Sequence, residues 1–230
     1  MPDRAPLSRE LIVSAAIGYV DEHGLTGLTM RRLGNSLDVE AMALYRYVNG
    51  REDLMEAVVE KLVGELRLAP DVELGPSDGW HAYLQWLAHS VRDMAHRHPN
   101  AFPLVATRHP AAPWLRPPLR SLEVVEDFLS ALVSRGFSDE AAVMAYRAFT
   151  SFLLGHLLLE VAARGADTSP VEVPLDEGAA EVSNADGGTG LDGVPQVARL
   201  RDLLAQDHAD AEFEQSLESL LDRLDLLLSQ

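Results

Sequence analysis

The chain has 230 residues, of which 47% are hydrophobic, and carries a formal net charge of −17. This composition is typical of a globular protein with a sizeable core and excludes a chain that is disordered throughout. The absence of cysteine excludes disulfides, zinc ribbons and thiol catalysis, and the lack of a signal core or a membrane-spanning apolar run predicts a soluble, cytoplasmic protein without a membrane partner.

Two helices are predicted first. Ser8 can cap the first helix, and Gly24 ends it. Thr29 can cap the second, in which apolar residues recur at i, i+3 and i+7 and therefore share one face. The first helix is expected to brace the second from behind through a stripe made of Leu11, Ile12, Ala15, Ala16, Tyr19 and Val20.

A third, short helix is expected from about Glu40 to Val48, after a tight turn at Asp38. Leu44 and Val48 lie four residues apart and can pack inward, which leaves the other face for a partner. Two short helices joined by such a turn form the helix-turn-helix, which places its second helix in the DNA major groove. The outward residues are either small or suited to phosphate and base contacts: Ala41, Met42, Ala43, Tyr45, Arg46 and Tyr47.

This stretch resembles the TetR family of transcriptional regulators. The resemblance rests on Gly24-Leu25, Leu28 to Leu33, Leu37-x-Val39, Ala43 to Val48, and Arg51 to Leu54. The family usually has glycine in the turn, whereas this chain has Asp38, a residue that tolerates the left-handed conformation better than most. The residues expected to contact a double-stranded DNA operator are Thr29, Arg31, Arg32, Ala41, Met42, Ala43, Tyr45, Arg46, Tyr47 and Arg51.

The acidic net charge opposes DNA binding, but the charge is unevenly distributed. Residues 1–66 carry seven Lys or Arg against eleven Asp or Glu, giving −4, and residues 67–230 carry twelve against twenty-five, giving −13. Arginines cluster around the expected docking face, and salt screens distant charge beyond about 8 Å. We therefore expect weak non-specific DNA binding with a modest salt dependence.

The rest of the chain is predicted to be helical as well, which makes the fold all-α. Residues 1–50 are expected to form the helix-turn-helix domain, 51–66 a connecting helix, and 67–230 a ligand-binding and dimerisation domain. Within the last domain, loops are expected at 70–79 and, as a mobile acidic segment, at 164–195. Helices are expected from Trp80 to Pro99, Leu119 to Val133 and Ser138 to Ala163, and over a final stripe from Phe213 to Leu228.

The last two helices carry more apolar surface than one small domain can bury. In a two-fold dimer they can form a four-helix interface, and a dimer is what a helix-turn-helix protein needs to read two half-sites. The two inferences come from different parts of the chain and agree on a homodimer.

The C-terminal part is similar to the tetracycline-repressor branch of the family at His96-Arg97, Thr107-Arg108, Gly136 to Ser138, and Phe213 to Leu221. That branch holds a magnesium chelate through a histidine shortly before the Thr-Arg pair, where this chain reads Phe102 to Val105. The resemblance thus implies a repressor controlled by a different ligand. We expect this ligand to be apolar or aromatic and expect no cofactor and no metal-binding residue of the protein, while a metal that accompanies the ligand stays open. The candidate ligand residues are Trp86, Val91, His98, Phe102, Thr107, Arg108, Trp114, Phe149, Phe152 and His156.

Several alternatives stay open. The aromatic residues of this set can form ordinary core instead of a pocket, and the histidines match no metal-ligand spacing. An activator of the same fold has the same sequence features as a repressor. A hydrolase needs a nucleophile beside a base, and the sequence pattern indicates no such pair of residues. A dimeric adaptor leaves the exposed Tyr45, Arg46 and Tyr47 without a purpose.

Overall fold

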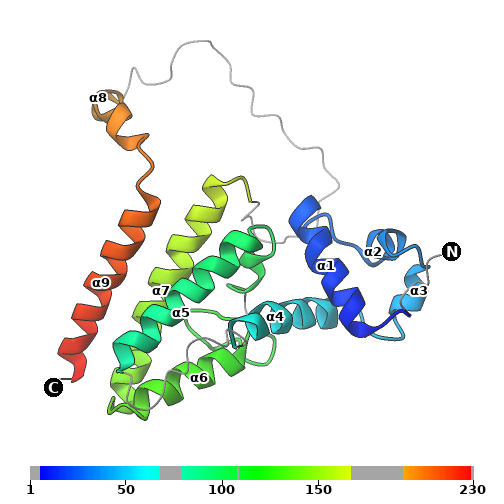
Figure 1. Ribbon diagram of the computed structural model, residues 1–230, viewed down its shortest axis with the longest axis horizontal. Helices are drawn as coiled ribbons and strands as arrows, with labels where there is room; N and C mark the ends of the chain where they lie inside the picture. The colour runs from blue at the N-terminus through cyan, green and yellow to red at the C-terminus, as the bar shows by residue number, and fades with distance from the viewer. Residues whose placement is uncertain (1–5, 68–78, 108, 167–193, 229–230) are drawn as a thin grey trace.

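The computed structural model describes residues 6–67, 79–107, 109–166 and 194–228. Over these residues the chain forms α-helices, one short 3-10 helix and no strand, so the predicted all-α fold class is confirmed (Figure 1). The elements are α1 (Arg9–His23), α2 (Met30–Ser36), α3 (Ala41–Leu44), α4 (Arg51–Arg67), α5 (Trp80–Arg97), the 3-10 helix η1 (Phe102–Leu104), α6 (Leu122–Val133), α7 (Asp139–Ala163), α8 (Pro195–Leu204) and α9 (Ala209–Leu228).

The three N-terminal helices pack against one another, and α1 also packs against α4. Both predicted N-caps are present, because the Ser8 hydroxyl accepts a hydrogen bond from the Leu11 N–H and the Thr29 hydroxyl accepts one from the Arg32 N–H. Asp38 has a φ of 55°, so it adopts the left-handed conformation expected of it in the turn.

Two details of this region differ from the sequence prediction. Helix α3 ends at Leu44 and continues as turns, so it is shorter than the predicted Glu40 to Val48. The buried face of α1 includes Val13 and Ile17, whereas Tyr19 is only half-buried. The face is rotated because α1 contacts α2 and α4 at the same time.

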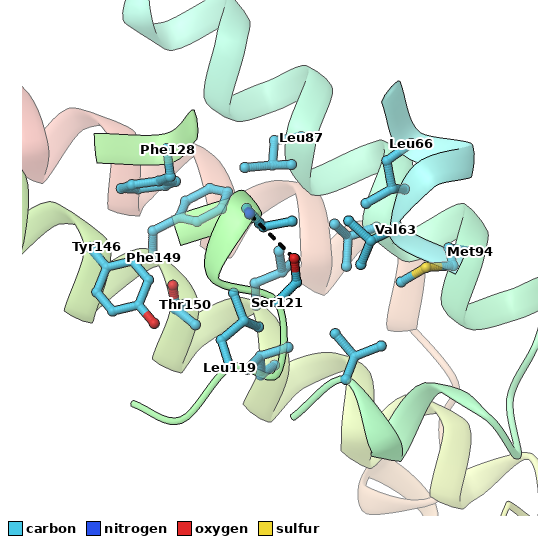
Figure 2. A pocket seen from close by; sticks show the side chains of 15 residues that line it. Val63, Leu66, Leu87, Met94, Leu119, Ser121, Phe128, Tyr146, Phe149 and Thr150 are labelled. Atoms are coloured by element: carbon cyan, nitrogen blue, oxygen red, sulfur yellow. Dashed lines mark hydrogen bonds between the residues drawn. The ribbon is translucent and has the colours of Figure 1, made fainter. Parts of the chain in front are cut away.

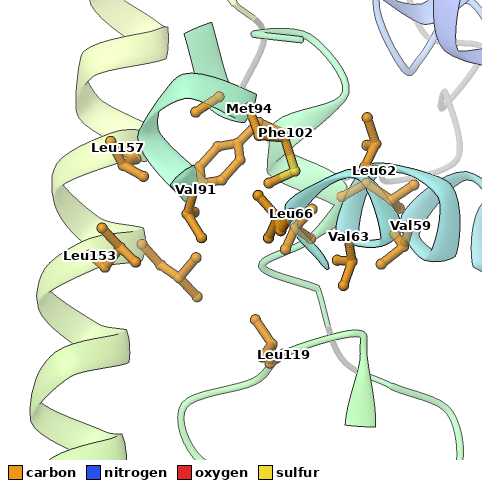
Figure 3. Close-up of a cluster of buried hydrophobic side chains, with 14 of the residues drawn as sticks. Val59, Leu62, Val63, Leu66, Val91, Met94, Phe102, Leu119, Leu153 and Leu157 are labelled. Carbon is orange, nitrogen blue, oxygen red and sulfur yellow. The ribbon is translucent and has the colours of Figure 1, made fainter. Parts of the chain in front are cut away.

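Helix α4 buries one face along its length, whereas Glu52 and Glu60 are exposed. Leu54, Val58, Leu62 and Leu66, which recur at helical spacing, are buried, and so is Val63 on the adjoining face. One end of α4 packs against α1 and the other against α5. Figure 3 shows the second contact, where side chains of α4 face residues of α5 and α7 across a shared apolar cluster. Helix α4 therefore belongs to two cores at once.

Helix α7 is the centre of the C-terminal part and contacts α5, α6 and α9. By length and composition alone it is long and apolar enough to cross a membrane, which corrects the expectation that no run reaches that length. Its contacts on three sides and its buried Glu160 are features of a core helix. Helix α9 lies alongside it and buries Phe213, Leu217, Leu221 and Leu224 of the predicted stripe (Figure 1).

The ends of several C-terminal elements differ from the prediction. Helix α6 begins at Leu122 instead of Leu119, because Ser121 caps it by accepting from the Val124 N–H. Helix α8 was not predicted, since it has no buried residue to create a pattern, and it stands apart from the other helices (Figure 1). The predicted loops at 70–79 and 164–195 fall mostly on residues 68–78 and 167–193, outside the described residues.

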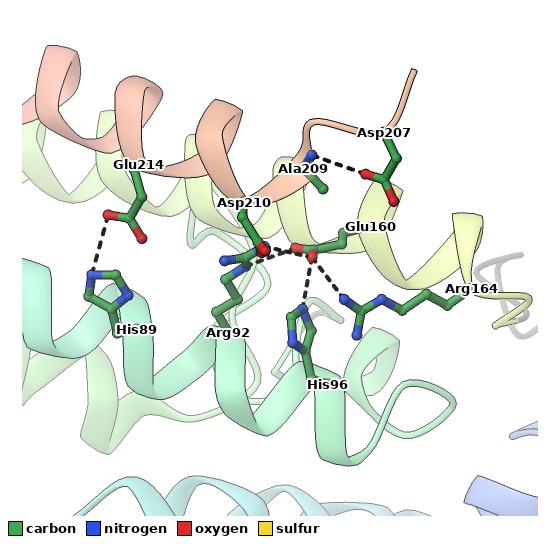
Figure 4. A network of polar contacts seen from close by, with 9 residues as sticks. All are labelled: His89, Arg92, His96, Glu160, Arg164, Asp207, Ala209, Asp210 and Glu214. Atoms are coloured by element: carbon green, nitrogen blue, oxygen red, sulfur yellow. Dashed lines mark hydrogen bonds and ion pairs between the residues drawn. The ribbon is translucent and has the colours of Figure 1, made fainter. Parts of the chain in front are cut away.

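A buried polar cluster joins α5, α7 and α9 (Figure 4). The Glu160 carboxylate accepts from Arg92 Nε and Nη2 at 3.1 and 2.9 Å, lies 2.8 Å from His96 Nε2, and accepts from Arg164 at 3.2 Å. Arg92 also donates to Asp210 of α9 at 2.6 Å. Burial alone raises the pKa of Glu160, but the hydrogen bonds from Arg92 and His96 outweigh burial and hold it below its ordinary value.

Candidate functional site

The outer face of α3 and the turn that follows it is exposed at one end of the molecule (Figure 1). Leu44 and Val48 anchor this segment in the core, as predicted. Met42 is 71% exposed, Tyr45 46% and Tyr47 39%. Large side chains with this exposure on so short a helix leave an apolar and aromatic surface available to a partner.

Basic side chains surround this face. Arg31, Arg32 and Arg46 are exposed and Arg51 is half-buried. Arg32 donates to the Gly27 carbonyl at 3.0 Å, and within the described parts of the chain none of the four arginines forms an ion pair with a carboxylate. Their charges are therefore available to an anionic partner such as the phosphates of DNA. Thr29, by contrast, uses its hydroxyl oxygen as the cap of α2.

The angle between α2 and α3 is set by a close approach at Gly34. A Cβ atom at this position would lie 2.8 Å from the Val39 carbonyl oxygen and 3.2 Å from the Ala41 nitrogen. Only glycine fits there without moving one helix away from the other. The exposed face of α3 is thus positioned by backbone packing.

The far end of the same segment is held by Arg9 of α1. Its guanidinium donates to both Asp53 carboxylate oxygens, at 2.9 and 3.2 Å, and to the Tyr47 carbonyl at 3.2 Å. Asp53 also accepts from the Asn49 N–H at 2.7 Å. These hydrogen bonds, from Arg9 first and then from Asn49, hold the pKa of Asp53 below its ordinary value. The start of α4 is thereby tied to α1 and to the end of the α3 segment.

A narrow apolar cavity of about 40 Å³ lies between α4, α5, α6 and α7 (Figure 2). A buried water needs roughly 10–15 Å³ by this measure, so the cavity holds a few waters at most, and a larger guest must move its walls. The wall residues are Val63, Leu66, Leu87, Val91, Met94, Val105, Leu119, Ser121, Val124, Phe128, Tyr146, Phe149, Thr150, Leu153 and Leu154.

Among the residues that the structure describes, no charged side chain lines the cavity, and three hydroxyls do. The Tyr146 hydroxyl donates to the Pro117 carbonyl at 3.1 Å, and burial raises the pKa of Tyr146 to about 12, so it stays neutral. The Ser121 hydroxyl donates to Glu123 and accepts from the Val124 N–H. Thr150 is the lining hydroxyl for which the described residues provide no hydrogen-bond partner. It is the polar group that a guest can bind.

Of the ten residues proposed from the sequence to bind a ligand, Val91 and Phe149 line this cavity. Arg108 lies outside the described residues. Phe102 is fully buried behind the cavity in the cluster of Figure 3. Thr107 donates to the Leu104 carbonyl at 2.6 Å and does not line the cavity.

The other five proposed ligand residues also lie away from the cavity. Trp114 is 73% exposed, and the half-buried Trp86 lies 6.1 Å from the Tyr83 ring on α5. The remaining three have structural partners: His98 lies 2.7 Å from Asp21 of α1, while Phe152 and His156 both pack against Phe213 of α9. A ligand in the cavity therefore cannot contact these five side chains without a rearrangement.

The sequence-based selection missed most of the cavity wall. Val63 and Leu66 of α4 were not among the residues proposed to bind a ligand. Aliphatic residues at helical spacing carry no signal that separates a cavity wall from ordinary core. The polar trio of Ser121, Tyr146 and Thr150 was likewise missed, since Ser121 is far in sequence from the other two.

Comparison with known proteins gives one family. The family model described as "Tetracyclin repressor-like, C-terminal domain" matches residues 74–227. The tetracycline repressor protein class E of Escherichia coli is 31% identical over 169 residues, which cover 73% of this chain and 75% of that protein. An HTH-type transcriptional regulator of Saccharopolyspora erythraea is 30% identical over 171 residues, 74% of this chain and 68% of that protein.

The solved structures agree. A possible TetR family transcriptional regulator from Streptomyces coelicolor A3(2) superposes with a TM-score of 0.69 at 29% identity, covering 96% of this chain and 100% of its own. The exposed α3 face, the unpaired arginines around it and these relatives lead to one conclusion. The chain belongs to the TetR family of DNA-binding transcriptional regulators.

Proposed function

We propose that the protein is a homodimeric repressor that leaves its operator when a small, neutral effector enters the cavity between α4, α5, α6 and α7. One observation carries this proposal: Val63 and Leu66 of α4 form part of the cavity wall, while α4 also packs against α1. A guest that widens the cavity must therefore displace α4. In a two-fold dimer this displacement changes the distance between the two α3 segments, which must match successive major grooves.

This mechanism gives each of three ranges of the chain a role. We propose that residues 1–50 bind DNA, that 51–66 connect, and that 67–230 bind the effector and dimerise. The DNA-contacting residues are those given above around α3. Family members are regulators, not enzymes, and they bind operators and small molecules as dimers. A regulator of this kind acts in the cytoplasm.

The cavity defines the chemistry of the effector. The described wall residues offer no charge, so an ionised ligand would find no counter-charge among them in an apolar site. Phe128 and Phe149 favour a flat or aromatic guest, and Thr150 can donate or accept one hydrogen bond. The name of the E. coli relative ties that protein to tetracycline. For this chain we propose a neutral, mainly apolar molecule with one hydroxyl or carbonyl group, bound without a metal.

The dimer interface is proposed on α7 and α9. Met144 of α7 and Leu226 of α9 are exposed at 48% and 63%, and both border a groove between the two helices. Leu159 of α7 is exposed at 74%. Apolar residues exposed on adjoining helices fit a self-complementary four-helix contact in which the same patch serves both subunits.

The test begins with an operator selected by the purified protein from random duplex DNA. Neutral aromatic compounds are then screened by thermal shift, and hits are titrated against the DNA complex by fluorescence anisotropy. We expect a compound that raises Tm to weaken DNA binding by 5- to 150-fold at saturation, about 1–3 kcal/mol of coupling. Unchanged operator affinity at saturation would refute the repressor scheme, and tighter binding would indicate an activator.

Two matched variants locate the effector. Thr150→Val keeps the side-chain shape and removes the cavity hydroxyl, so it should weaken effector binding. Thr26→Val makes the same change at a threonine that is exposed and lies outside the cavity, and it should have no effect on effector binding. Equal effects of the two substitutions would place the effector elsewhere.

A further inference from the structure

The residue that joins the cavity to the DNA-binding helices is found in the segment before α6. Leu119 and Ser121 both line the cavity, and Arg120 stands between them. The backbone is extended at Ser121, and in extended chain successive side chains point to opposite sides. The Arg120 side chain therefore leaves the cavity wall on its outer side.

Arg120 is buried although it is charged. Its side chain is 7% exposed and its Nε has no hydrogen-bond partner. Nη2 donates to the Glu52 carboxylate at 2.8 Å, and Nη1 lies 3.4 Å from the Thr107 hydroxyl. The backbone N–H of Arg120 donates to the carbonyl of Val105, another cavity residue, at 3.0 Å. The guanidinium is buried while the Glu52 side chain is 71% exposed, so Arg120 reaches from the interior to a carboxylate at the surface.

Glu52 stands in the first turn of α4, where the DNA-binding helices converge. The next residue, Asp53, is the carboxylate that Arg9 binds together with the Tyr47 carbonyl. A continuous set of contacts thus runs from the cavity wall through Arg120 to the start of α4, and on to the end of the α3 segment.

We propose that Arg120 is a positioning residue that transmits the widening of the cavity to α3. When a guest displaces Leu119 and Ser121, Arg120 moves with them and pulls Glu52. The first turn of α4 then rotates, and the α3 segment moves with it. This inference rests on the proposed function, in which a cavity guest lowers operator affinity. It assigns regulation to a single ion pair, Arg120 with Glu52, in addition to the direct contact of α4 with the cavity.

The test replaces the unidentified effector by a substitution. Val91→Phe inserts a phenyl ring into the cavity from α5, and the cavity is too small to hold it without wall movement. The effect of Val91→Phe on affinity for the selected operator duplex is measured in four backgrounds: wild type, Glu52→Gln, Arg120→Met and Glu56→Gln. Glu56 lies one turn further along α4 and does not pair with Arg120, so it controls for the loss of one negative charge near DNA.

Only the ratio of affinities with and without Val91→Phe is compared, because general effects on DNA affinity cancel in that ratio. We expect Val91→Phe to weaken binding about tenfold in wild type and in Glu56→Gln, and less than about threefold in Glu52→Gln and Arg120→Met. Arg120→Lys, which keeps the charge, should restore part of the response. Thermal unfolding of each variant confirms that it is folded, and the exposed Glu52 supplies a result if Arg120 variants are unstable.

Hydrogen exchange at residues 49–56 gives a readout of the start of α4 without DNA. Val91→Phe should speed exchange there in wild type and leave it unchanged in Glu52→Gln. Equal weakening of DNA binding in all four backgrounds would overturn the role of Arg120 while leaving the cavity mechanism intact. A folded Val91→Phe protein with unchanged operator affinity in every background would overturn both.

Discussion

Replacing Glu160 with glutamine should lower the stability of the C-terminal part substantially. Its side chain is 5% exposed, and the carboxylate neutralises Arg92, which is itself 11% exposed. Removing one partner of a buried ion pair typically costs about 3–5 kcal/mol, because the other charge stays buried. Arg92 keeps a second partner in Asp210, which is 90% exposed. We therefore expect the lower end of that range, about 3 kcal/mol.

The measurement is urea denaturation at one fixed protein concentration, since dimerisation makes apparent stability depend on concentration. The matched control is Asp93→Asn, which breaks an exposed pair with Arg97 on α5 and should cost less than about 0.5 kcal/mol. A loss below about 1 kcal/mol for Glu160→Gln would show that Arg92 relaxes into water or onto Asp210, and that the cluster does not hold α5, α7 and α9 together.

A comparison of wild type with Glu160→Gln also tests how stability depends on pH. Because the pKa of Glu160 is lowered in the folded state, its stabilisation is fully present above the unfolded value of about 4.5. It is lost as the pH falls through the lower, folded value. The stability difference between wild type and Glu160→Gln should accordingly shrink as the pH falls below about 4.5. A difference that grows on acidification would contradict the direction of the shift.

The remaining predictions concern DNA binding. Tyr45→Ala and Arg46→Ala should each weaken binding to the selected operator by about 1–3 kcal/mol in anisotropy titrations while leaving Tm unchanged, since both side chains are exposed; a fall in Tm would make them core residues. Gly34→Ala should lower stability by about 1–3 kcal/mol in urea, because its Cβ would meet the Val39 carbonyl at 2.8 Å, and the shifted α3 should bind operator less tightly. The logarithm of the affinity for random duplex DNA should fall with the logarithm of the salt concentration, with a slope that corresponds to fewer than roughly six released counterions per dimer. A steeper slope would reveal more phosphate contacts than the exposed arginines provide.

The N-terminal helices were predictable because their signals are local. The caps at Ser8 and Thr29, the left-handed turn at Asp38, and the inward pair of Leu44 and Val48 all appear as expected. Each depends on residues within one or two turns of one another, where sequence spacing determines which side chains share a face. The exposed face of α3 was predicted as the set of residues that are not among these inward positions.

The cavity was not predictable in the same way. Selection by residue type favoured Trp86 and Trp114, which lie on or near the surface, over the aliphatic residues of α4. A cavity wall is defined by where helices from distant parts of the chain converge, and aliphatic core residues are identical in type to lining residues. The pair of Arg120 and Glu52 illustrates the same limit, since 68 residues separate two partners that lie 2.8 Å apart.

The acidic net charge and DNA binding are reconciled by the way the arginines are used. In the described C-terminal part, Arg92, Arg120 and Arg164 are bound to carboxylates, and so contribute little field at the surface. Around α3, the arginines at 31, 32, 46 and 51 form no ion pair with any described carboxylate, so their field remains available to phosphates. Because salt screens exposed charges beyond about 8 Å, the local arrangement of arginines governs the approach of DNA, and the distant acidic residues oppose it little.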